Sequence, residues 1–138
     1  MISLAEGQIE GVFRTVGPVG RATDGTPCYI LLRFYKDGLA LFVSLCIDVE
    51  AQWNEVEKWF NRDSATADVL LSTGLGQYKM EGSHIQFSTR QYDRNSDMLV
   101  NYEHAGEIVG DHMWIQTTFT GHPFAGEHEF VPLCAAQG

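Results

Sequence analysis

Alternation of apolar and polar positions is clearest between Gly76 and Val131. Within this stretch two dipeptides, Gly82-Ser83 and Gly110-Asp111, each interrupt an alternating segment. Glycine in the first position of a two-residue loop is typical of the type II′ turn, which joins antiparallel strands. The pattern therefore predicts two hairpins and a returning strand, the parts of a curved antiparallel sheet.

The first of these hairpins has a well-specified register. With Gly82-Ser83 as the loop, Tyr78 pairs with Phe87 on one face and Lys79 pairs with Gln86 on the other. A slip by one residue would move every side chain of a strand to the opposite face, so the segregation of apolar from polar pairs favours this register.

The second hairpin places a histidine where an aliphatic residue is expected. Its outward pairs include Glu107 with Trp114, and the returning strand Glu127–Val131 turns His128 and Phe130 inward. The inward pairs are Ile108 with Met113, Gly106 with Ile115, His104 with Thr117, and Tyr102 with Phe119.

The N-terminal part predicts a strand over 8–16 and a hairpin formed by 28–35 and 39–47 around Lys36-Asp37-Gly38. A two-residue loop would pair Phe34 with Leu41, whereas a three-residue loop with a bulge at Gly38 would place Cys28 opposite Cys46. We favour the first register because it segregates the faces better. Both faces are apolar, so we expect another segment to cover the sheet.

The expected cover is a helix over about 48–62. Asp48 is a suitable N-cap, and apolar residues recur at helical spacing. They are Val49, Trp53, Val56 and Phe60.

Together these elements predict an all-β, mainly antiparallel fold. We expect an up-and-down barrel of about eight strands, with the one helix inserted between strands 3 and 4. Residues 1–138 are expected to form a single domain, with a flexible tail over about 134–138.

The first strand carries a short motif that supports a resemblance. Gly11-Val12-Phe13 resembles the Gly-x-Trp pattern of lipocalins, with Phe in place of Trp. In this motif and in its meander the chain resembles the calycin group, the lipocalins and fatty-acid-binding proteins. That resemblance implies an interior site for a small apolar ligand. The chain departs from the group in the position of its helix and in lacking an arginine near the last strand.

Composition narrows the classes of partner. The formal net charge is −9, which disfavours nucleic acid and anionic membrane surfaces. The N-terminus lacks the pattern of a signal peptide, and no apolar run approaches the length of a membrane span. Three cysteines without a C-x-x-C pair fit neither a disulfide framework nor a zinc site. Cys28 and Cys46 lie within apolar runs, so we expect them to be inert core thiols. We therefore expect a reduced, cytoplasmic protein.

The inward histidine defines the candidate site. A buried polar pair must be hydrogen-bonded or face a wet cavity. If the interior holds a cavity, apolar walls with a few polar groups would suit a small ligand. The residues expected to line it are His104, Thr117, Tyr102, Tyr78, His128 and Phe87.

No catalytic or metal-binding set is expected from the sequence. Serines lie outside any nucleophile motif, and the inward positions offer too few ligands for zinc, so no cofactor is predicted. The first hypothesis is a non-enzymatic barrel that binds a small, largely apolar molecule. The alternatives are an interaction or structural protein with a filled core, with a homodimer through exposed Trp114, and an enzyme with His104 as general base.

Overall fold

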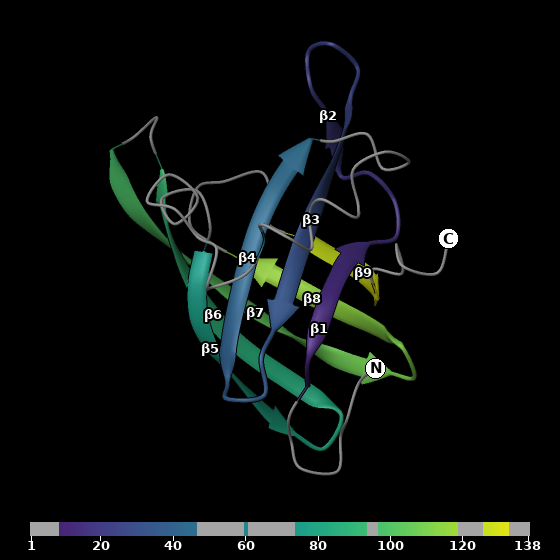
Figure 1. Cartoon of the computed structure of the whole chain (residues 1–138), viewed down its shortest axis with the longest axis vertical. Helices are drawn as coiled ribbons and strands as arrows, with labels where there is room; N and C mark the ends of the chain where they lie inside the picture. The colour runs from purple at the N-terminus through teal and green to yellow at the C-terminus, as the bar shows by residue number, and fades with distance from the viewer. Residues whose placement is uncertain (1–8, 47–59, 61–73, 94–96, 119–125, 133–138) are drawn as a thin grey trace.

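The computed structural model describes residues 9–46, 60, 74–93, 97–118 and 126–132. These residues form antiparallel strands (Figure 1). The strands are β1 (Gly11–Thr15), β2 (Gly20–Arg21), β3 (Pro27–Phe34), β4 (Leu39–Cys46), β5 (Gly74–Glu81), β6 (His84–Asp93), β7 (Met98–Val109), β8 (His112–Thr118) and β9 (Gly126–Pro132).

The sheet closes on itself. Its strand order is β1-β9-β8-β7-β6-β5-β4-β3-β2, and β1 also pairs with β3. Eight strands therefore complete the barrel, and the short β2 extends one side of it. Sequential antiparallel neighbours confirm the predicted meander, and Figure 1 shows β1, β3 and β4 crossing in front of β7 and β8.

The two glycine turns confirm the predicted registers. Gly82 and Gly110 both have φ of +63°. The second loop residues, Ser83 and Asp111, do not have positive φ, because Asp97 is the one non-glycine residue with positive φ in the described part of the chain. Positive φ in the first loop position alone is the type II′ geometry. All described pairs follow the predicted order, from Glu81 opposite His84 to Glu103 opposite Thr118.

The register favoured for the first hairpin is wrong. Phe34 lies opposite Ala40, and Cys28 lies opposite Cys46, as in the three-residue alternative. Gly38 has φ of +102° and donates its N–H to the carbonyl of Tyr35. Segregation of faces could not select the register because both faces are buried here.

The predicted helix over 48–62 is corrected. The described part of the chain contains no helix. Residues 48–59 and 61–62 lie outside the described part. Phe60, the described residue of the range, sits in a bend and its carbonyl accepts a 2.9 Å hydrogen bond from Arg33. The expected cover is nevertheless present at this residue, because Phe60 is fully buried against Leu31 and Leu41 on the outer face of β3 and β4.

The prediction that Cys28 and Cys46 are free core thiols is wrong. Cys28 and Cys46 form a disulfide that joins β3 to β4. The bond follows from the corrected register, which places the two residues directly opposite each other. Disulfides are typical of oxidising compartments, so this bond weighs against the cytoplasmic location, which stays a prediction. Cys134 and the tail over 134–138 lie outside the described residues.

Aromatic and aliphatic side chains pack inside the barrel. Phe34 lies at the centre of an aromatic group, with ring centroids 5.3 Å from both Tyr78 and Phe87 in edge-on contact. Ile115 and Phe130 add to the same core from β8 and β9. Rings in these arrangements gain favourable contacts beyond burial of area.

Candidate functional site

His104 lies inside the barrel between two threonines. Its Nδ1 is 2.8 Å from the hydroxyl of Thr117 on β8, and its Nε2 is 2.9 Å from the hydroxyl of Thr89 on β6. All three side chains are buried. A neutral imidazole has one donor and one acceptor nitrogen, so one threonine hydroxyl accepts a hydrogen bond from the ring and the other donates a hydrogen bond to it.

Aromatic rings enclose the same histidine. Its ring stacks on Phe87 with centroids 4.3 Å apart, and Phe42 and Tyr102 lie 5.0 and 6.2 Å away. Burial among these rings lowers the pKa of His104 from 6.5 to about 3, because the charged form would lose its hydration. The ring is therefore neutral at physiological pH, and the hypothesis of a general base gains no support, since such a base works best with a pKa near the working pH.

The structure brings four of the six predicted site residues together. His104, Thr117, Phe87 and Tyr102 are in the group just described. Tyr78 is also buried, but its hydroxyl forms hydrogen bonds with backbone groups of Ile9 and Tyr35.

That hydroxyl accepts a 3.1 Å hydrogen bond from the N–H of Ile9. It also lies 2.9 Å from the carbonyl of Ile9 and 2.6 Å from that of Tyr35, to either of which it can donate. The remaining predicted residue, His128, is half-buried on β9 opposite Ile115. Tyr78 and His128 therefore have surroundings different from those of His104.

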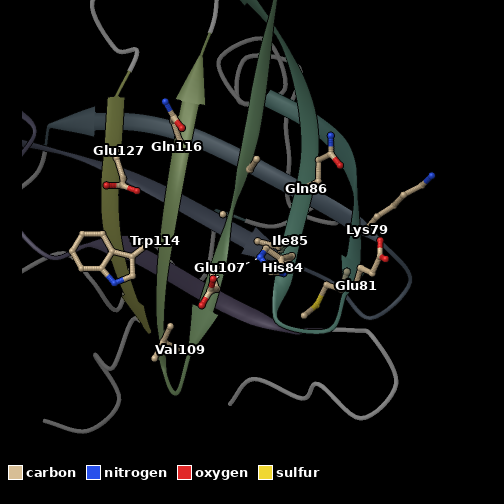
Figure 2. Close-up of a pocket in the computed structure, with 13 residues that line it drawn as sticks. Lys79, Glu81, His84, Ile85, Gln86, Glu107, Val109, Trp114, Gln116 and Glu127 are labelled. Atoms are coloured by element: carbon tan, nitrogen blue, oxygen red, sulfur yellow. Dashed lines mark ion pairs between the residues drawn. The ribbon is translucent and has the colours of Figure 1, made fainter.

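A groove of about 870 Å³ lies on the outer face of the barrel, over β5 to β9 (Figure 2). Two rows of outward side chains cross it from strand to strand. The first row is Glu81, His84, Glu107, Trp114 and Glu129, and the second is Lys79, Gln86, Ala105, Gln116 and Glu127. All of these residues except Glu129, the neighbour of Trp114 on β9, line the groove.

A small side chain, that of Ala105, and the backbone of Gly106 form the middle of this groove. Ala105 and Gly106 of β7 lie between the longer side chains of the flanking strands. A Cβ at Gly106 would overlap the backbone carbonyl of Trp114, so β7 and β8 approach each other too closely there for any other residue. Glycine is often found where backbones come this close.

Trp114 is the largest apolar side chain in the groove. It is 44% exposed and has a glutamate on each side, Glu107 on β7 and Glu129 on β9. Each glutamate also contacts a histidine: Glu107 lies 3.7 Å from His84, and Glu129 pairs with His112.

The sequence predicted the pair formed by Glu107 and Trp114 but not the groove. The missing information is the register between the hairpins, from β6 to β7 and from β8 to β9, which brings the lining residues together. The glycine within the alternating strand was a signal for a separate feature, the close approach of β7 and β8 at Gly106, because glycine there often marks such an approach. Thr89 was also missed as a hydrogen-bond partner of His104. The predicted register could have found it, because extending that register past Gln77 and Ser88 pairs Thr89 with Gly76 on the inward face.

Three comparisons with known proteins found no match for the chain. No family model, no curated protein and no solved structure matches it. In the described part of the chain, no three His, Cys, Asp or Glu side chains lie close enough to hold a metal ion together. No helix long and apolar enough to cross a membrane occurs among the same residues.

Proposed function

We propose that this chain is a binding domain that docks a protein partner in the groove on its outer face. The observation that carries the proposal is Trp114, which is 44% exposed within that groove. Exposed tryptophans surrounded by a polar rim are characteristic of interaction sites, where they supply much of the binding energy.

The interior offers less for recognition than the outer face does. Both ring nitrogens of His104 are engaged by threonine hydroxyls, so the polar end of a ligand would have to displace one of these hydrogen bonds. The core side chains contact one another. Binding of a small apolar molecule inside a calycin-like barrel remains a prediction, and extraction of copurified small molecules followed by mass spectrometry tests it.

Selection from a display library of random short peptides tests docking on the outer face. The full chain is immobilised, and the same selection is run on Trp114→Ser and on Met98→Ser. Met98 is a matched control because it is also an exposed apolar residue, at 61%, and lies outside the groove. We expect peptides enriched on the original chain to be lost on Trp114→Ser and kept on Met98→Ser.

Two results would overturn the proposal. One is a selection in which no peptide family is enriched. The other is a set of enriched peptides that bind Trp114→Ser as well as they bind the original chain. Thermal unfolding of each variant shows whether it has kept the fold.

A further inference from the structure

We infer that the occupant of this groove is an extended peptide segment rich in lysine or arginine, with one cationic side chain over Trp114 between Glu107 and Glu129. This inference rests on the proposed function and adds the chemistry of the partner to it.

The charge of the groove favours a cation. Three glutamates line it, Glu81, Glu107 and Glu127, and Lys79 at its far side is the one lysine or arginine among the lining residues. The side chain of Glu107 is 52% exposed, and that of Glu129 is 26% exposed. A cation that arrives from solvent would therefore share Glu107 with His84 and Glu129 with His112.

The position of Trp114 adds a second attraction for the same group. A guanidinium or ammonium over an indole ring is attracted to the negative face of the ring. Glu107 and Glu129 stand on the strands at either side of the ring. A cation over Trp114 would thus contact an aromatic face and two carboxylates together.

The dimensions of the groove favour an extended segment. Each row crosses five strands, and at about 4.8 Å per interstrand spacing it spans about 19 Å. An extended chain of about six residues covers that length. The groove is open to solvent along the sheet, as Figure 2 shows, whereas sites for small molecules enclose most of the ligand surface.

A second copy of the chain fits this face poorly. A two-fold interface brings the same patch of both copies together. It would place Glu107 and Glu127 against an equally acidic surface, in a chain whose net charge is already −9. Like charges brought together in this way oppose association.

Fluorescence anisotropy with defined peptides tests the inference. The probes are fluorescein-labelled peptides of about ten residues, slightly longer than the groove. Every second residue in them is arginine, lysine, serine, leucine or glutamate, and threonine fills the remaining positions. Each probe is titrated with the original chain and with Trp114→Ser, Glu107→Gln/Glu129→Gln and Glu10→Gln/Asp24→Asn. The last variant removes two exposed charges outside the groove, so it has the same net charge as the groove variant.

We expect the arginine and lysine probes to bind more tightly than the others. Loss of the two carboxylates beside Trp114 should weaken binding of the arginine and lysine probes at least about fivefold, which corresponds to about 1 kcal/mol. The control variant should change their binding less than about twofold. Binding should also weaken as salt is raised from about 50 to about 300 mM, because salt screens exposed charges.

The outcomes separate the two proposals. If the serine or leucine probe binds at least as well and depends on Trp114, the groove docks a partner but the cationic inference is overturned. The cationic inference is likewise overturned, and docking in the groove is kept, if light scattering shows a dimer that the Trp114→Ser substitution dissociates. If the charge-matched control weakens the cationic probes as much as the groove variant does, the attraction comes from net charge alone and the inference is overturned. If no probe depends on Trp114, both proposals fail.

Discussion

The ring of His104 stacks on the ring of Phe87, with centroids 4.3 Å apart, in the interior of the barrel. Because the ring is held neutral there, with a pKa of about 3, it links stability to pH. In the unfolded chain the same histidine takes up a proton near pH 6.5.

Between these two pKa values the unfolded state binds more protons, so stability is full above about pH 6.5 and falls as pH decreases toward 3. The contribution of one proton is up to about 1.4 kcal/mol per pH unit. We expect His104→Gln, which can still bridge the two threonines, to remove this part of the pH dependence in urea denaturation. His84→Gln serves as the control because His84 is exposed. An NMR titration in which the His104 ring titrates near 6.5 would contradict the prediction.

Gly106→Ala should destabilise the barrel. The added Cβ would meet the carbonyl of Trp114 and force β7 away from β8, which costs about 1–3 kcal/mol when it is accommodated by shifts of a well-packed structure. Gly17→Ala is the matched control, because no atom lies within 4 Å of its Cβ position. Chemical denaturation measures both variants, and equal midpoints would show that the two strands are not closely packed at Gly106.

Reduction of the disulfide should lower stability. Cys28 and Cys46 are separated by 18 positions in the sequence, and a cross-link closing a loop of this length stabilises by about 3 kcal/mol in the chain-entropy view. The expected result is a lower denaturation midpoint with reductant present, reproduced by Cys28→Ser/Cys46→Ser without it. Cys134→Ser should leave the effect of reductant intact. A midpoint insensitive to reductant would argue that the bond contributes nothing.

Tyr78→Phe should loosen the start of the barrel. The lost hydroxyl leaves the buried N–H of Ile9 without this acceptor, and an unsatisfied buried donor costs about 1–3 kcal/mol. The same hydroxyl has a raised pKa because of burial, so the phenol stays protonated and able to donate. Amide hydrogen exchange at Ile9 should become faster in Tyr78→Phe. Exchange at the control amide, Ile115 on β8, should change only as much as the change in the free energy of global unfolding requires. Unchanged exchange at Ile9 would refute the role of the hydroxyl.

The part of the fold that could be predicted is the part with one polar face. Along β5 to β8 most outward side chains are polar and the inward ones are mostly apolar. A single register therefore satisfies both faces, and the turns at Gly82 and Gly110 agree with it. From these registers the inward position of His104 followed directly.

The N-terminal hairpin could not be assigned in the same way. Leu31 and Leu41 are buried on its outer face, so two registers satisfied the pattern about equally well. The disulfide was missed for the same reason, since pairing of Cys28 with Cys46 requires the register that we did not favour. The apolar spacing that includes Phe60 indicated which side chain would face the sheet, but spacing alone did not determine the backbone.

For the candidate site, the sequence predicted on which face of the sheet each residue lies, but it did not predict the shape of the outer surface. The residues that line the groove come from five strands, and the alternation within each hairpin does not report the registers between hairpins, from β6 to β7 and from β8 to β9. The acidic and aromatic character of the groove follows only when neighbouring strands are placed side by side.

The strict alternation along β7 separates two tasks within one strand. Tyr102, His104 and Ile108 are buried in the barrel, while Glu103, Ala105 and Glu107 are exposed. Substitutions at the exposed positions leave the packed interior untouched. This strand could therefore acquire a new binding preference in steps of single residues without first regaining stability, which makes the outer rows a natural place for randomised libraries in protein engineering.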